Sequence, residues 1–263
     1  MSDLSAIHQQ LFAKAPSIFA TEPYRELSDK YKFIPTIDVV DALAAQGFTP
    51  AKVMESRVRN LDKAGFAKHA IRFRNSDILP QVGDLVPEIV LVNSHDGTSA
   101  FQISAGLYRL VCSNGLTVGS DQMTVRQRHS GQIDDILEGV FSVVDDFPEV
   151  ARTAREWQGI QLTPAQQIAF ARAAAPLRWD SGDEDQAPPI NPSHLLQPWR
   201  GVDSGKDLWT TFNVVQENII KGGVRAKGSD GRRRRSKAVN SVNEDQRLNK
   251  ALWTLAAEMA KAA

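Results

Sequence analysis

The sequence has one cysteine, Cys112, and no long apolar segment. A single thiol excludes an internal disulfide and a zinc site built from several cysteines. No stretch approaches the roughly 18 apolar residues that a membrane-spanning helix needs. Residues 1–15 lack the basic flank and the following apolar run that are typical of a signal peptide. We therefore expect a cytoplasmic protein without a membrane partner.

The chain also lacks an excess of charge of either sign, since 31 basic residues balance 31 acidic ones. Such a chain has no global attraction to nucleic acid, so any attraction must come from local clusters. There is no P-loop, no dinucleotide fingerprint and no histidine/cysteine metal spacing. The sequence predicts no cofactor and no metal ligand. Its 263 residues, 42% of them hydrophobic, are enough to bury a core.

Short segments with alternating polar and apolar residues occupy the region from 52 to 128, separated by turn sequences. Strands joined by short turns are typical of an antiparallel meander, whereas a parallel repeat would require helices between them. Helical periodicity dominates the chain after Ser130, and Thr163-Pro164 is a typical helix start. The sequence thus predicts an α+β fold, with an antiparallel β-meander sheet packed by helices and a helical C-terminal half.

Composition divides the chain into three parts. Residues 1–180 are expected to form the α+β core domain, and the acidic, proline-rich residues 181–203 a linker. Residues 204–263 are expected to form C-terminal helices that carry a basic loop and pack on the core. Trp209 and Trp253 lie beside leucines at helical spacing, which favours core positions over base stacking; Trp199 does not share this pattern.

Arginines recur at every second position of three predicted strands, 52–59, 68–74 and 122–128. If the apolar faces of these strands contact the helices, the opposite face is rich in arginine and carries one carboxylate, Glu55. Arginines at this spacing can follow a phosphate backbone and stack on bases. A polar outer face is equally typical of any half-exposed antiparallel sheet. The expected nucleic-acid contacts on this face are Arg57, Arg59, Lys68, Arg72, Arg74, Arg126 and Arg128.

A second basic cluster extends from residue 221 to residue 237, with eight basic residues and one acid, Asp230. Glycines flank the cluster, so we expect a flexible basic loop. Runs of this kind bind nucleic acid or other anions. A loop that is merely solvated, or balanced by the acidic residues 183–185, is the alternative. The expected contacts are Lys221, Arg225, Lys227, Arg232, Arg233, Arg234, Arg235 and Lys237.

Candidate catalytic residues are few. His95 and Asp96 lie at a predicted turn, where an active site could display them, although Asp-Gly at residues 96–97 is also typical of a plain turn. Cys112 could be a nucleophile with His95 as base, but it closes an apolar run, which favours a buried thiol. We assign no catalytic residue on this basis.

Several motifs are specific when they are taken together. They include Asn93-Ser94-His95-Asp96-Gly97 and the segment from Tyr108 to Leu116. Others are Phe33-Ile34-Pro35-Thr36, Arg57-Val58-Arg59, Lys68-His69, Leu208-Trp209, Asn213, Gln216-Glu217-Asn218, Gly222-Gly223, the arginine run, Leu248-Asn249 and Leu252-Trp253. The chain resembles, over most of its length, a bacterial family carried by phages, prophages and plasmids, the domain of unknown function 932 family. The resemblance implies a mobile-element setting but no particular activity. The expected helix-flanked sheet also resembles that of phage single-strand annealing proteins, a likeness of fold alone.

We therefore expect a nucleic-acid-binding protein of a mobile element that favours single-stranded DNA. Annealing of complementary strands in recombination or replication, by a homo-oligomer, is compatible with this hypothesis and needs no catalytic residue. Two alternatives stay open. One is a metal-dependent nuclease or hydrolase, and the other is an interaction protein that blocks a host defence complex.

Overall fold

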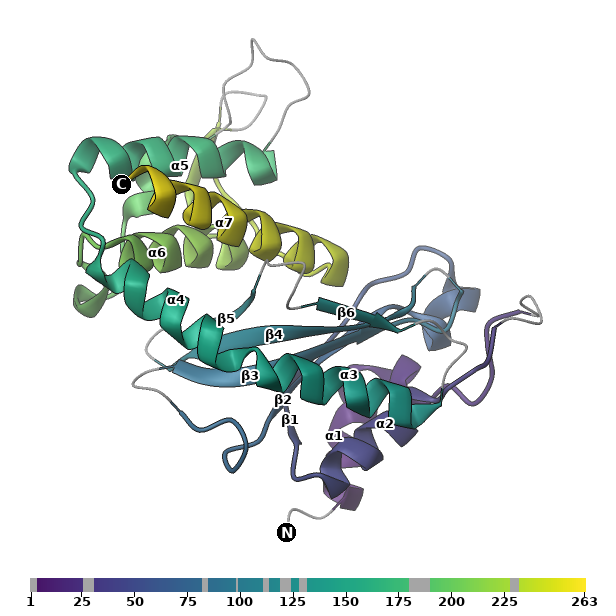
Figure 1. Ribbon diagram of the computed structural model, residues 1–263. Coiled ribbons are helices and arrows are strands. Elements are labelled where there is room, and N and C mark those ends of the chain that lie inside the picture. Colours follow the sequence, from purple (N-terminus) through teal and green to yellow (C-terminus); the bar gives the residue numbers. More distant parts are fainter. Residues whose placement is uncertain are drawn as a thin grey trace. The chain divides into compact units, whose positions relative to one another are not determined.

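Figure 1 shows the structure of the chain, a computed structural model. It describes residues 4–25, 31–81, 85–97, 99–110, 114–118, 124–127, 132–179, 190–227 and 232–263. The chain divides into two compact units, which are described in turn. We name Met1–Pro148 with Asn240–Val242 the sheet unit, and Glu149–Val239 with Asn243–Ala263 the helical unit. The division falls at Pro148 rather than at the expected residue 180.

The sheet unit contains an antiparallel sheet whose strands are neighbours in space as they are in sequence. The order is β1 (Thr49–Glu55), β2 (His69–Arg74), β3 (Leu85–Asn93), β4 (Phe101–Arg109) and β5 (Asn114–Thr117), and β6 (Thr124–Gln127) also pairs with β4. β5 and β6 occupy different parts of the same edge of β4, since β3 pairs with its other edge. The expected meander and the α+β class are confirmed.

Helices cover one face of this sheet. α3 (Ile133–Asp145) lies against β3, β4 and β6, and it also contacts α2 (Thr36–Ala45) (Figure 1). Gly139 of α3 faces Ile103 and Val125, and a Cβ on this glycine would lie 2.9 Å from Ile103 Cδ1. The close approach buries Val140 and Ile103 completely. The remaining elements are α1 (Leu4–Lys14) with the 3₁₀ turns η1 (Pro16–Phe19) and η2 (Leu61–Phe66).

The helical unit is built around α6 (Leu208–Lys221), which is buried along almost its whole length. A helix that is buried all round lies in the centre of its unit. Trp209 and Trp253 are 2% and 6% exposed, so their expected core positions are confirmed. The other helices are α4 (Phe147–Gly159), α5 (Pro164–Trp179) and α7 (Val242–Ala262), with the 3₁₀ turns η4 (Pro192–Leu196) and η5 (Gly201–Asp203). The sheet unit includes the first two residues of α4 and the first residue of α7.

The expected linker is structured where the structure describes it. Residues 180–189 lie outside the described residues, but 190–203 carry η4 and η5. Leu195 is fully buried, and Ile190 forms an antiparallel bridge with Ala226. This part of the expected linker therefore belongs to the helical unit. Among the described residues, no helix has the length and apolar character required to cross a membrane.

Candidate functional site

The first predicted site, the arginine face of the sheet, contains a buried arginine. Arg72 lies on β2 and its side chain is 5% exposed. Its Nη1 donates to Glu88 Oε2 at 3.2 Å and to the Leu116 carbonyl at 3.1 Å. Its Nη2 donates to the Gly115 carbonyl and to Thr117 Oγ1, each at 3.3 Å. These acceptors belong to β3 and β5, so Arg72 connects strands within the sheet unit.

Arg74 shares the same carboxylate. Its Nε and Nη2 lie 2.8 Å and 2.7 Å from Glu88 Oε1, and its guanidinium carbon lies 4.1 Å from the centre of the Tyr108 ring. The Glu88 side chain is completely buried. Two arginines therefore neutralise one buried carboxylate, which the alternation of residues in β2 does not reveal.

The strand register corrects the expected composition of the arginine face. Arg72 pairs with Val90, so its face also carries Ala70, Val90 and Val92. These three residues are buried together with Val242 and form an apolar cluster. The expectation of an exposed face made chiefly of arginine is wrong, because this apolar cluster occupies part of the face.

The side chains of the first strand, β1, also lie on different faces of the sheet from those expected. Glu55 pairs with His69 and so lies on the opposite face from Arg72. β1 ends at Glu55, and Arg57 and Arg59 are exposed beyond its end. The register is irregular between Pro50 and Lys52. The alternation of residues 52–55 is regular, so the expectation that Glu55 lies among the arginines is wrong because the strand presents its other face.

The other residues of the first predicted site are scattered. Arg126 is exposed on β6. Lys68 is half-buried just before β2, and burial lowers the pKa of its ammonium group although Asp96 opposes this effect. Arg128 lies outside the described residues. The register places Arg126 on the same face of the sheet as Arg72 and Arg74, as expected. Arg57 and Arg59 lie beyond the end of β1, and Arg72 is buried, so the predicted set does not form one exposed arginine surface.

His95, the candidate base, is completely buried. Its Nε2 lies 3.0 Å from Thr36 Oγ1, to which Asn93 Nδ2 also donates at 3.0 Å. Its ring centre lies 4.9 Å from that of Phe33. Asp96 accepts from Ser94 Oγ at 2.8 Å, and Lys63 Nζ lies 3.8 Å from its carboxylate. His95 is not displayed at a surface, and Cys112 lies outside the described residues.

A chain of hydrogen bonds connects Thr36 to a second histidine. His69 Nε2 lies 3.0 Å from Thr36 Oγ1, and its Nδ1 lies 2.8 Å from Ser17 Oγ. Ser17 Oγ donates to Glu55 Oε2 at 2.5 Å. Because the carboxylate only accepts, the serine oxygen accepts from His69 Nδ1–H, and Nε2 accepts from the Thr36 hydroxyl. Thr36 Oγ1 then accepts from His95 Nε2–H, so the chain specifies one neutral tautomer for each histidine.

The geometry of this hydrogen-bond network fits a structural role and not a catalytic one. Burial, together with the neighbouring His95, lowers the pKa of His69 to about 3. In a Ser-His-acid triad the histidine would bridge the other two groups, whereas here Ser17 lies between His69 and Glu55. Within the described residues, no group of three or more histidine, cysteine, aspartate or glutamate side chains could hold a metal ion.

The second predicted site, the basic loop, forms a hairpin. β7 (Arg225–Lys227) pairs antiparallel with β8 (Arg233–Arg235), and we name these two strands the basic hairpin. Gly222 begins the hairpin with φ +73°, and a Cβ there would lie 2.5 Å from the Lys237 carbonyl oxygen. Only glycine allows this approach. The expected loop is therefore a paired structure on both sides of residues 228–231, which lie outside the described residues.

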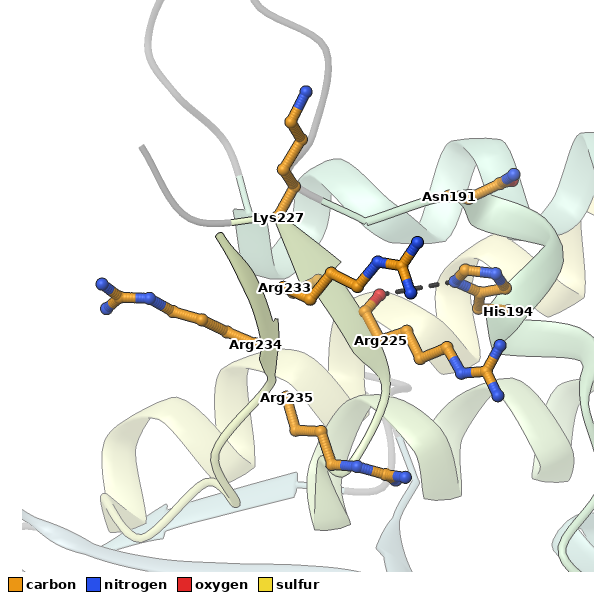
Figure 2. Close-up of a pocket in the computed structure, with 8 residues that line it drawn as sticks. Asn191, His194, Arg225, Lys227, Arg233, Arg234 and Arg235 are labelled. Atoms are coloured by element: carbon orange, nitrogen blue, oxygen red, sulfur yellow. Dashed lines mark hydrogen bonds between the residues drawn. The ribbon is translucent and has the colours of Figure 1, made fainter. Parts of the chain in front are cut away.

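Pairing places cations opposite one another. Arg225 pairs with Arg235 and Lys227 with Arg233, so four cations share one face of the hairpin, and Arg234 pairs with Ala226 on the other. Figure 2 shows Arg225, Arg233 and Arg235 on the side of His194, whereas Arg234 extends away from them. The hairpin lines a pocket of about 840 Å³ together with His194 and Asn191.

These cations differ in their partners from Arg72, Arg74 and Lys221 of the predicted set. In the parts of the chain that the structure describes, no carboxylate forms an ion pair with Arg225, Lys227, Arg233 or Arg235. Lys221, by contrast, lies 3.0 Å from the buried Glu217. Arg232 and Lys237 are exposed beside the hairpin.

Sequence reasoning missed the residues that face the hairpin. His194 Nδ1 lies 3.4 Å from the Arg225 carbonyl oxygen, to which it can donate (Figure 2). His194 and Asn191 fall within the expected linker and have no motif that would have identified them. Their contribution depends on the packing of η4 beside the hairpin.

Comparison with known proteins gives a family and several relatives, two of which are described below. The family described as Domain of unknown function (DUF932) matches residues 23–253. The UPF0380 protein YafZ of Escherichia coli (strain K12) is 38% identical over 255 residues, which cover 97% of this chain and 91% of the relative. The UPF0380 protein YfjQ of the same strain is 37% identical with the same coverage. No solved structure matches the chain.

Proposed function

Since the chain belongs to the family of the domain of unknown function 932, which specifies no ligand, we propose from its own residues that it binds nucleic acid. Single-stranded DNA is the favoured ligand, and the cytoplasm is the proposed location. The observation that carries the proposal is the face of the basic hairpin with Arg225, Lys227, Arg233 and Arg235.

The chemistry of this face suits phosphate groups. Arginine and lysine side chains donate hydrogen bonds and accept none, so a pocket lined by them matches a ligand rich in acceptor oxygens. Like charges placed directly opposite one another destabilise a strand pair. An anion in the pocket of about 840 Å³ would offset the repulsion between Arg225 and Arg235.

A polymer of phosphates fits better than a single phosphate. The cations extend along two strands and continue to Arg232 and Lys237, which are also exposed. Neutralising several phosphates releases counterions, and this release is a main source of affinity for nucleic acid. Phosphate contacts leave the base edges available and carry no sequence information.

Strand annealing is the activity that such binding would support. A protein that binds the sugar-phosphate backbone of DNA and leaves the bases unpaired allows two complementary strands to pair without nucleotide hydrolysis. We propose that a homo-oligomer performs this role during recombination or replication of a mobile element. A calibrated mass in solution, measured with and without an oligonucleotide, tests the oligomer.

A gel shift with labelled single-stranded and double-stranded DNA tests the proposed function. We expect the full chain to shift the single strand at lower protein concentration than the duplex, and to do so equally in EDTA. Cleavage of the DNA that stops in EDTA would instead favour the nuclease alternative. The absence of a shift with either DNA at micromolar protein would contradict the proposal and favour a protein partner.

A further inference from the structure

Trp199 is the tryptophan that differs most from the core tryptophans. Its side chain is 56% exposed, whereas Trp209 and Trp253 are 2% and 6% exposed. It lines a pocket of about 330 Å³ that also includes Arg225 and Arg235 of the basic hairpin. An exposed indole beside two guanidinium groups suits a ligand that has both a planar ring and an anionic group.

We propose that Trp199 stacks on an unpaired nucleobase while Arg225 and Arg235 contact the phosphates on either side of it. This inference rests on the proposed function and adds to it the part of the ligand that is recognised. Aromatic rings bind single-stranded nucleic acid in this way, since every base has a π-face. In a duplex the bases are already stacked and paired, so the site would prefer single strands.

The indole is held in place before any ligand binds. Its Nε1 donates to Asn218 Oδ1 at 2.7 Å. Asn218 is itself 3% exposed, and its Nδ2 donates to the carbonyl groups of Leu195 and Gln197 at 2.9 Å and 3.0 Å. One edge of the ring is thus bonded to the buried centre of the helical unit, while Trp199 as a whole stays 56% exposed. A ring that is already ordered loses little entropy on binding.

Glycine keeps the hairpin close to this ring. A Cβ on Gly223 would lie 3.1 Å from Trp199 Cη2, and the residue has φ +78°. Arg235 Nη1 donates to the Gly223 carbonyl at 3.0 Å, which holds its guanidinium beside the indole. The backbone of the hairpin therefore positions both the aromatic group and one cation for the same ligand.

Two oligonucleotides of equal length separate the base contact from the phosphate contacts. One is oligothymidine, and the other has abasic sites at every position and so keeps only the sugar-phosphate backbone. We expect the full chain to bind oligothymidine at least about fivefold more tightly, as for one stacked base. Trp199→Leu should weaken oligothymidine binding by about fivefold to 150-fold and leave abasic binding unchanged.

Trp199→Phe should restore most of the affinity for oligothymidine, because phenylalanine also stacks. Val202→Ala, at a nearby side chain that is 70% exposed, is the matched control and should bind both strands like the parent. Thermal unfolding of each variant confirms that it is folded.

The outcomes distinguish the two proposals. If neither strand binds, the proposed function is overturned and the inference with it. If both strands bind equally and Trp199→Leu changes neither affinity, phosphate binding stands and the stacking site is overturned. If Trp199→Leu weakens binding of both strands equally, the indole maintains the shape of the site, and stacking on a base is also overturned.

Discussion

The guanidinium group of Arg72 and the carboxylate of Glu88 form an ion pair across neighbouring strands, with Nη1 3.2 Å from Oε2 and the side chains 5% and 0% exposed. A buried pair of this kind does not by itself make a protein more stable than an apolar pair would. Removing Arg72, however, leaves the buried carboxylate with Arg74 as its partner and deprives the carbonyl groups of Gly115 and Leu116 of their donor. The pair therefore ties the stability of the sheet unit to an arginine that resembles a ligand-binding residue in the sequence.

Arg72→Ala should lower the free energy of unfolding by roughly 1–3 kcal/mol, because Glu88 would keep only Arg74 as its partner and the buried carbonyl groups of Gly115 and Leu116 would lose their donor. Urea denaturation measures this change. Arg57→Ala is the matched control, since Arg57 is exposed, and it should change stability by less than about 0.5 kcal/mol. Equal midpoints for both variants would show that the ion pair has no structural role.

Gly115→Ala should destabilise the sheet unit, because the new Cβ would lie 2.9 Å from the Arg72 guanidinium carbon. The arginine is held by its hydrogen bonds, so we expect a loss of about 1–3 kcal/mol, typical of overpacking. Gly65→Ala is the control, since a Cβ there meets nothing within 4 Å. Thermal unfolding should separate the two variants, and equal melting temperatures would argue against the close contact.

The salt dependence of DNA binding should report the cations on the pocket side of the basic hairpin. For a single strand, log affinity falls by about 0.7 per phosphate contact for each unit of log salt concentration. Replacing Arg225, Arg233 and Arg235 by alanine removes up to three contacts, so the slope should become shallower by about 2. Fluorescence anisotropy at several salt concentrations measures this slope.

Arg234→Ala is the comparison variant for this prediction. Arg234 also lines the pocket, but it is equally exposed and its side chain extends to the other side of the hairpin (Figure 2). Its slope should remain close to that of the parent. A slope reduced as much per residue as in the triple variant would indicate diffuse attraction to the whole segment instead of a defined face.

Stability should fall as the pH decreases from about 6.5 towards 3. Burial and the nearby His95 lower the pKa of His69 from 6.5 to about 3. The unfolded chain takes up a proton in this range that the folded chain does not, so the free energy of unfolding decreases by about 1.4 kcal/mol per pH unit for this group. His69→Gln should remove this contribution.

Urea denaturation at pH 6.5 and pH 5 measures the effect of His69→Gln. His8→Gln is the control, because His8 is partly exposed and lies 2.7 Å from Asp41. That variant should keep the dependence that His69 confers. If His69→Gln instead shows the same pH dependence as the parent, the buried histidine does not titrate as proposed.

The local order of residues was sufficient to predict the strands and helices themselves. The short turns between β3, β4 and β5 predict antiparallel neighbours, because a connection of a few residues cannot cross to a parallel strand. Thr163 and Pro164 predict the start of α5, since a proline at the first helical position loses no hydrogen bond. Trp209 and Trp253 were assigned to the core from helical spacing, and both are buried.

Tertiary structure alone decided which cations are exposed. Arg72 alternates with apolar residues as a surface arginine would, but Glu88, its partner, comes from the next strand, 16 residues later. The basic cluster from 221 to 237 is apparent in the sequence, yet its division into two faces depends on the pairing of β7 with β8. Trp199 is 56% exposed, and Asn218, 19 residues later, bonds one edge of its ring. Burial and pairing depend on residues distant in sequence, and local alternation contains no information about them.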